Sequence, residues 1–184
     1  MTARITPAQP PFPAEIQSSL DAVMRGKPPL VLFTTLARDP RLFQKFFAGG
    51  LLDRGNLTLR QREIVINRTT ALCKSEYEWG VHIAAVAAHA GLDDVQVESL
   101  ANGGPADTCW TAEERLLLTL CDQVHANCNV EEDLWRALAA AFSDEAILEL
   151  LMLAGFYRTV SYLTNALCLP LEPGAARFPR STGD

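Results

Sequence analysis

Apolar residues recur at helical spacing along most of this chain, and this periodicity limits the fold more than any other feature. Two capping boxes mark helix starts, because Thr58 is followed three residues later by Gln61 and Thr111 by Glu114. β-Branched residues never alternate with polar ones over a useful length, so strand signals are scarce. The pattern predicts an all-α chain of about eight helices. These are expected over residues 14–25, 39–53, 59–73, 75–90, 93–101, 112–127, 131–142 and 144–167.

Prolines punctuate both ends of the chain, where helical periodicity is lost. The first thirteen residues hold four prolines, and three more follow the last periodic segment. The chain has 184 residues, 48% of them hydrophobic, which suffices for one core but would leave two domains small. We therefore expect an N-terminal arm over residues 1–13, one helical domain over 14–168 and a C-terminal arm over 169–184.

Charge and composition point away from nucleic acid and membrane partners. The formal net charge is -6, whereas binding to a phosphate backbone depends on clustered Lys and Arg. The most apolar run, Ala146 to Gly155, contains Glu149 and is too short to span a bilayer, and the start lacks the apolar segment of a secretory signal. The five cysteines include no Cys-x-x-Cys pair, which favours reduced thiols. We expect a cytoplasmic protein.

Glu63 is a carboxylate within an apolar stripe. Leu59 and Ile66 recur around it at helical spacing, which predicts that the side chain of Glu63 faces inward. Burying an ionised carboxylate costs several kcal/mol unless it is paired, so Glu63 needs a partner. One interpretation is a functional partner in the next helix. The other is a structural ion pair with an arginine, and the candidates are Arg62, Arg68 and Arg158.

The next predicted helix carries three polar residues on one side. At about 100° per residue, Ser75, Glu78 and His82 fall within about 60° of one another. A carboxylate and an imidazole four residues apart, beside an inward-facing Glu63, are typical of acid–base sites. Two alternatives stay open: a core histidine whose ring Glu78 merely holds, and a divalent metal site of Glu78, His82 and His89.

The spacing of these residues resembles that of the carboxymuconolactone decarboxylase and alkylhydroperoxidase D superfamily: Glu63, a gap of eleven, then Ser75-x-x-Glu78-x-x-x-His82. The resemblance spans roughly residues 42–168 and includes a Tyr-Glu-Trp-x-x-His string and a later Leu-x-x-Ala-x-Phe-Tyr stretch. It implies a single-domain, alkylhydroperoxidase D-like helical bundle. It also implies a homo-oligomer, with a dimer, a trimer or a hexamer as the alternatives.

In the peroxidase branch of the superfamily, a Cys-x-x-Cys pair occupies the positions of Ser75 and Glu78, and a glutamate and a histidine activate a thiolate. A serine and a glutamate form no disulfide and supply no thiolate. Cys73 is no substitute, because it lies nine residues before His82 and about 180° away around a continuous helix. The sequence therefore disfavours thiol-based peroxide reduction.

The decarboxylase branch is more similar, because it carries a Glu-x-x-x-His helix without paired cysteines. By this resemblance the catalytic candidates are His82 as proton donor, Glu63 as the residue that orients and tunes it, and Glu78. The candidate substrate-binding residues are Ser75, Tyr77 and Trp79.

The sequence thus favours an enzyme that uses acid–base chemistry on a small carboxylate or lactone substrate, without a metal or other cofactor. No arginine lies within the motif itself to bind the substrate acid. Two other functions remain as alternatives. One is an alkylhydroperoxidase-type peroxidase, and the other is a non-catalytic helical oligomer in which the polar cluster is a structural network.

Overall fold

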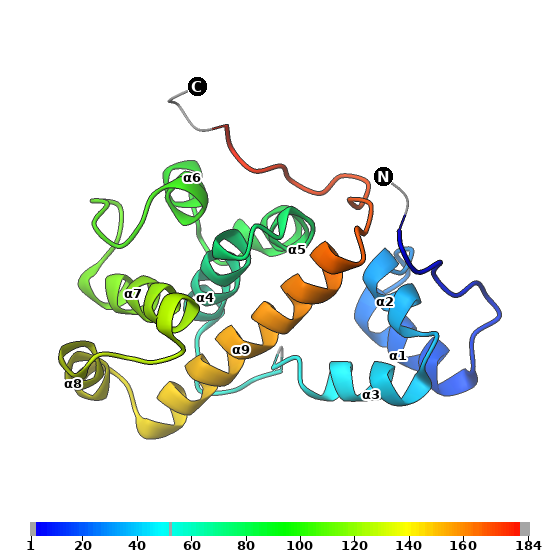
Figure 1. The fold of residues 1–184 in the computed structure, drawn as a ribbon, viewed down its shortest axis with the longest axis horizontal. Helices are drawn as coiled ribbons and strands as arrows, with labels where there is room; N and C mark the ends of the chain where they lie inside the picture. Colours follow the sequence, from blue (N-terminus) through cyan, green and yellow to red (C-terminus); the bar gives the residue numbers. More distant parts are fainter. Residues whose placement is uncertain (1–2, 52, 181–184) are drawn as a thin grey trace.

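The computed structural model describes residues 3–51 and 53–180, and within these residues the chain forms nine α-helices, one π-helix and no strand (Figure 1). The elements are α1 (Ala14–Met24), α2 (Val31–Leu36), α3 (Pro40–Ala48), α4 (Leu59–Leu72), α5 (Glu76–His82), η1 (Ile83–Ala87), α6 (Asp94–Asn102), α7 (Ala112–Asn127), α8 (Glu132–Ala141) and α9 (Asp144–Ala166). The predicted all-α class is confirmed.

Three local differences separate the predicted helices from the observed ones. The helix expected over 39–53 ends at Ala48, because Gly49 and Gly50 follow and neither favours a helix. The short helix α2 was absent from the prediction, since six residues are too few to show a period. The helix expected over 75–90 is continued beyond His82 by the wider turn of η1.

Helix α4 is the centre of the fold. Every residue from Glu63 to Ala71 is buried, and α4 packs against α5, α6, α7 and α9. A helix that is covered on all sides has no face left for charged groups, so those it carries must be satisfied inside the protein. In Figure 1, α9 crosses the molecule diagonally, with α1–α3 on one side and α6–α8 on the other.

A second, smaller apolar cluster joins the first three helices. Ile16 and Leu20 of α1 form this buried cluster together with Ala37 and with Phe43 of α3. The main cluster holds the apolar residues of α4, α7 and α9. The molecule therefore has one large core and a satellite core beneath α1–α3.

Both arms lie against the helices. The backbone amide of Arg4 donates to the carbonyl of Leu167 at 2.8 Å. The C-terminal arm passes over α5 (Figure 1), where the amide of Ala176 donates to the carbonyl of Gly80 at 3.0 Å and the ring of Phe178 lies 4.9 Å from that of Trp79. The C-terminal arm is thus a cover for α5.

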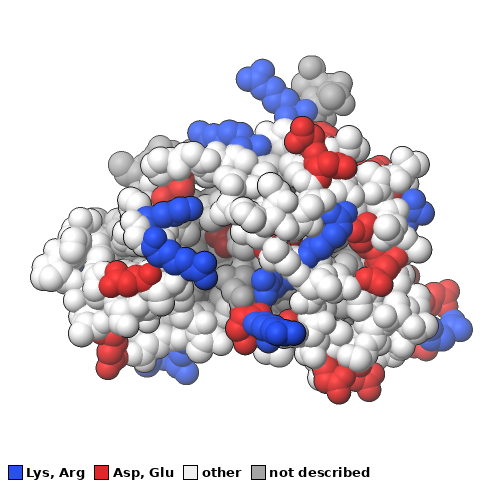
Figure 2. Space-filling view, turned by 180° about the vertical axis from the view of Figure 1, so that it is seen from behind, with Lys and Arg blue, Asp and Glu red and all other residues white. Residues whose placement is uncertain are grey.

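Helix α9 is long and apolar enough to cross a membrane by length and composition, but half of its most apolar window is buried in the core. It packs along α4 as the second central helix. Figure 2 shows acidic and basic side chains interspersed among uncharged ones over the face opposite to that of Figure 1. The long apolar stretch of α9 is therefore accounted for by packing.

The contact between α5 and the C-terminal arm predicts that Gly80→Ala is destabilising. A Cβ at this position would overlap the carbonyl oxygen of Ala176, so the arm has to move. We expect a loss of about 1–3 kcal/mol in the free energy of unfolding, measured by chemical denaturation.

Gly155→Ala in α9 is the matched control, because a Cβ there meets no atom of the described residues within 4 Å. Alanine is the better helix former, so this change should stabilise the protein by roughly 0.5–1 kcal/mol. Equal effects of the two substitutions would show that the arm does not press on α5.

Candidate active site

A tight turn between two helices builds the candidate active site. The capping box at Thr58 sets the start of α4, which ends at Leu72. Lys74 then adopts a left-handed conformation with φ 55°, and the amide of Ser75 donates to the carbonyl of Thr70 at 2.9 Å. This reversal lays α5 back along α4. It brings two residues of α5 beside the carboxylate that α4 carries inward.

The site is an imidazole held between two carboxylates. Nδ1 of His82 lies 2.9 Å from Oε2 and 3.2 Å from Oε1 of Glu63. Nε2 of His82 lies 3.4 Å from Oε1 of Glu78. All three side chains are buried, with 1% of the Glu63 side chain and 9% of each of the other two exposed. In the imidazolium form both ring nitrogens donate, one to each carboxylate.

The two carboxylates decide the charge of the ring. Burial by itself lowers the pKa of His82, because it disfavours the imidazolium. The charge of Glu63 and its hydrogen bond oppose this effect, Glu78 adds to them, and together they raise the pKa of His82 to about 10. The ring therefore carries a proton at neutral pH.

Two further polar groups complete the surroundings of the ion pair. The amide of Asn67 donates to Oε2 of Glu63 at 3.3 Å and to its backbone carbonyl at 2.8 Å. Oε2 of Glu78 is buried and has no hydrogen-bond partner in residues 3–51 and 53–180. A buried oxygen without a partner is costly, which indicates a place for a group from outside the chain.

The three predicted substrate-binding residues are buried around this cluster, but they contact other parts of the chain. Oγ of Ser75 lies 2.8 Å from Oγ1 of Thr164. The hydroxyl of Tyr77 donates to Glu172 and accepts from the amide of Leu32 at 3.0 Å. Both hydroxyls are therefore engaged within the protein.

Trp79 packs its ring against Phe178 and is only 1% exposed. Its Nε1 is buried without a hydrogen-bond partner in the part of the chain that the structure describes. The ring of Trp79 therefore packs between α5 and the C-terminal arm.

The sequence interpretation missed Tyr157 at the site and considered Arg62 only as a partner of Glu63. The ring of Tyr157 meets that of His82 edge-on, with centroids 5.2 Å apart. Burial raises the pKa of Tyr157 well above its ordinary value, the charges of Glu78 and Glu63 add to this, and Arg62 opposes it. Arg62 therefore contributes positive charge near the cluster, and its Nε is buried without a partner among the described residues. The Leu-x-x-Ala-x-Phe-Tyr stretch was the available signal for Tyr157.

The structural pairing of Glu63 with an arginine is wrong. Arg68 binds Asp122, with Nε 2.6 Å from Oδ1. The other two candidates donate to backbone carbonyls, Arg62 to Asp53 and Arg158 to His125. The residue paired with Glu63 is His82.

The alternative of a metal site with His89 is also contradicted. His89 is exposed, whereas Glu78 and His82 are buried. The wide turn of η1 lies between them and shifts the helix register, so the face expected for a continuous α-helix is not kept. Within the described ranges no three His, Cys, Asp or Glu side chains are grouped to hold an ion.

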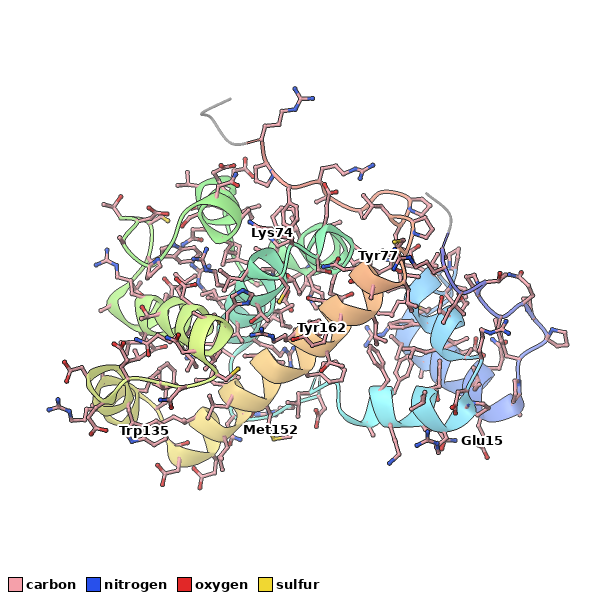
Figure 3. All side chains as sticks on the ribbon, viewed as in Figure 1. Glu15, Lys74, Tyr77, Trp135, Met152 and Tyr162 are labelled. Atoms are coloured by element: carbon pink, nitrogen blue, oxygen red, sulfur yellow. The ribbon has the colours of Figure 1, made fainter. Side chains whose placement is uncertain are left out.

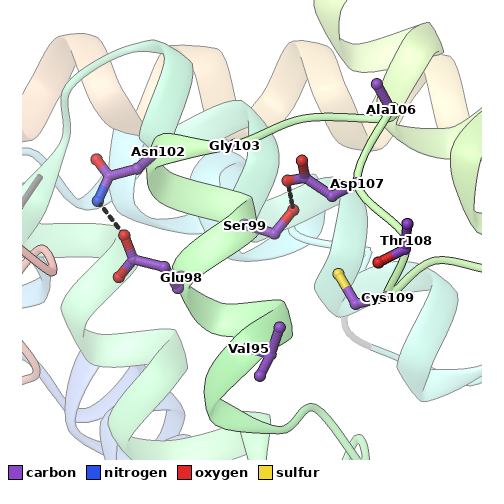
Figure 4. A pocket seen from close by; sticks show the side chains of 9 residues that line it. All are labelled: Val95, Glu98, Ser99, Asn102, Gly103, Ala106, Asp107, Thr108 and Cys109. Carbon is purple, nitrogen blue, oxygen red and sulfur yellow. Dashed lines mark hydrogen bonds between the residues drawn. The ribbon is translucent and has the colours of Figure 1, made fainter. Parts of the chain in front are cut away.

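A surface hollow of about 550 Å³ lies elsewhere, on α6 and the loop after it. Figure 4 shows its two internal hydrogen bonds, from Ser99 to Asp107 at 2.6 Å and from Asn102 to Glu98 at 2.7 Å. Cys109 lies at its edge. None of the cluster residues lines this hollow, and its polar groups satisfy one another.

One known protein family matches part of this chain. Residues 40–120 match the model of the carboxymuconolactone decarboxylase family. This match agrees with the resemblance found from the spacing of Glu63, Glu78 and His82. No curated protein matched the sequence.

Solved structures of the same fold cover nearly the whole chain. A peroxidase-related protein from Silicibacter sp. TM1040 superposes with a TM-score of 0.82 at 20% identity, covering 97% of this chain and 96% of that one. A peroxidase-related protein with an alkylhydroperoxidase AhpD core, from Ralstonia eutropha JMP134, superposes with a TM-score of 0.77 at 22% identity. The match covers 88% of this chain and 87% of that one. The debrominase Bmp8 in complex with 2,3,4-tribromopyrrole superposes with a TM-score of 0.77 at 13% identity, covering 95% of this chain and 94% of that one. At these identities the likeness shows the fold alone.

The raised pKa of His82 predicts a loss of stability at alkaline pH. The folded-state pKa lies above the ordinary value of about 6.5, so the contribution of the imidazolium is complete below about pH 6.5. It is lost as the pH rises through about 10. Chemical denaturation across this range should show a larger loss for the wild-type protein than for His82→Gln, which removes the titrating group. Parallel pH curves for the two proteins would contradict the assigned ion pair.

Proposed function

We propose that this chain, whose residues 40–120 match the carboxymuconolactone decarboxylase family, is an acid–base enzyme that acts on a small carboxylate or lactone substrate. The reaction is of the decarboxylase or lyase type. As part of the same proposal, the enzyme works in the cytoplasm as a homo-oligomer. It uses no cofactor and binds neither nucleic acid nor a membrane.

The single observation that carries the proposal is the position of His82 between two buried carboxylates. A purely structural ion pair needs one carboxylate, and Glu63 already supplies it with a 2.9 Å contact to Nδ1. The second carboxylate, Glu78, shares the proton on Nε2 at 3.4 Å and keeps one buried oxygen without a partner. A proton shared in this way, beside an unsatisfied oxygen, is suited to transfer to a bound molecule.

The chemistry assigns a role to each group. When a carboxylate leaves as CO₂, the bond between the two carbons breaks and its electron pair stays on the remaining carbon as an enolate. The positive charge of His82 stabilises that developing negative charge. The proton between His82 and Glu78 then passes to the carbon, and Glu63 holds the ring in place through Nδ1.

The substrate acid needs a cation, and Arg62 is the residue that supports this part of the proposal. Its charge acts on Tyr157, which contacts the imidazole ring edge-on. Its Nε is buried and unpartnered among the described residues, so it is available to an incoming carboxylate. Positive charge at Arg62 also offsets the repulsion that Glu63 and Glu78 exert on an anionic substrate.

Peroxide reduction is the alternative that the names of two similar structures suggest. It requires a thiolate at the site, and this chain has Ser75 and Glu78 at those two positions. Ser75 is buried and hydrogen-bonded to Thr164. A hydroxyl in that setting does not replace a thiolate that reduces peroxide.

We expect His82→Gln to keep the fold and to lower turnover of carboxymuconolactone roughly a hundredfold or more, because the proton donor is removed. The measurement is CO₂ release, with circular dichroism as the check on folding. His89→Gln is the matched control, since this histidine is exposed and lies outside the cluster. It should leave turnover unchanged.

Wild-type turnover in His82→Gln would end the proposal. A thiol-dependent peroxide assay, run on the same samples, tests the alternative directly. Rapid peroxide turnover by the wild-type protein, together with no decarboxylation, would favour the peroxidase instead.

A non-catalytic oligomer with a structural network makes a different prediction. A double-mutant cycle with Glu63→Gln and His82→Gln measures the coupling between the two side chains in the free energy of unfolding. The pair contributes to stability in both cases, since the pKa of His82 is raised in the folded protein. The structural alternative holds if the cycle measures a coupling of roughly 1 kcal/mol or more while His82→Gln releases CO₂ as fast as the wild-type protein.

A further inference from the structure

A second cluster of reactive side chains lies apart from the Glu63–His82 pair, where α4, α7 and α9 meet. It lines a hollow of about 490 Å³ that contains a thiol, an imidazole and a guanidinium. Its lining includes Leu72, Cys73, His125, Arg158, Ser161 and Tyr162. In Figure 3, Tyr162 is labelled on α9 and Lys74 at the end of α4, which together locate this region.

The thiol and the imidazole of this cluster are in contact. Sγ of Cys73 lies 3.7 Å from Nδ1 of His125, which is in the last turn of α7. Neither residue is fully buried, so the pair is open to small molecules. Cys73 is expected to face away from His82, and its sulfur contacts the histidine of another helix.

The thiol and the imidazole of the pair are both neutral at rest. Burial raises the pKa of the Cys73 thiol, against the effects of Ser161 and Arg158, so the resting form is the neutral thiol. Burial and the charge of Arg158 lower the pKa of His125, with Arg68 and Lys74 acting in the same direction and Asp122 against them. These shifts disfavour a resting thiolate–imidazolium pair, so His125 accepts the proton only as the Cys73 sulfur attacks the disulfide.

Arg158 provides fixed positive charge at the same hollow. Its Nη1 donates to the carbonyl of His125 at 2.9 Å, and its Nε donates to the hydroxyl of Tyr162 at 2.8 Å. These bonds hold the guanidinium in place. Its Nη2 has no hydrogen-bond partner among the described residues, which leaves it available to an anion.

We propose that Cys73 is a thiol–disulfide exchange site for small anionic disulfides, with His125 as the proton acceptor and Arg158 as the anion-binding residue. His125 takes the thiol proton, and the Cys73 sulfur forms a bond to one sulfur of the disulfide. The S–S bond of the disulfide breaks, and the second sulfur leaves as a thiolate that receives the proton from His125. Cys73 is oxidised to a mixed disulfide and one half of the small disulfide is reduced to a thiol.

Two of the other cysteines, Cys121 and Cys109, lack this combination. Cys121 is buried, and burial raises its pKa to about 12. Cys109 is partly buried like Cys73, but its hollow is lined by Glu98 and Asp107, which repel anions. Cys109 is therefore a matched internal control of opposite charge.

The test uses the full chain and two probes, glutathione disulfide as the anionic disulfide and cystamine as the cationic one. Trypsin cleavage after Arg68, Lys74 and Arg115 places Cys73 and Cys109 in adjacent peptides, 69–74 and 75–115, each with one cysteine. Mass spectrometry then gives the rate of mixed-disulfide formation at each site. We expect Cys73 to react roughly tenfold faster with glutathione disulfide than with cystamine, and Cys109 to show the opposite order.

Two variants separate the roles. Arg158→Gln should abolish the preference of Cys73 for the anionic probe and leave Cys109 unchanged, and Arg158→Lys should restore part of it. His125→Asn should lower the rate of mixed-disulfide formation at Cys73 about tenfold with both probes. The proposal is overturned if Cys73 stays unmodified, if it prefers cystamine as Cys109 does, or if Arg158→Gln leaves its preference intact.

Discussion

The ion pair between Glu63 and His82 is the constraint to which the rest of the molecule is fitted. Helix α4 is buried on all sides, so a carboxylate in its middle must be neutralised from within the protein. The left-handed turn at Lys74 folds α5 back to supply the imidazole, and α9 covers the pair with Tyr157. Three helices therefore meet at one buried charge.

Local signals were enough to predict most of the fold. The capping boxes at Thr58 and Thr111 are formed as the sequence indicates, and both helices begin directly after them. What the sequence did not show depends on distant contacts. Helix α2 has no capping side chain of its own, and its first amides are bound by Glu172 and Tyr77 from far along the chain. The wide turn of η1 has no apolar period that distinguishes it from an α-helix.

The same distinction applies to the candidate site. Glu63, Glu78 and His82 were found from spacing, because all three lie on two consecutive helices and their directions follow from helical geometry. Tyr157 was not, since its contact with the imidazole depends on how α9 packs against α5 and not on any local period. For His89 the spacing was misleading. It predicted that His89 lies on the same helix face as His82, whereas His89 is exposed and the wide turn of η1 separates the two residues.

The cover of α5 has a consequence for the order in which the protein matures. Glu76 accepts the amide of Phe178 at 3.1 Å, a contact that joins residues 102 positions apart. A ribosome completes α4 and α5 long before it reaches this segment, so the two helices first meet without their outer layer. During that interval Trp79 and Gly80 lack their contacts with Phe178 and Ala176. The segment that covers α5 is therefore made after every helix that it shelters.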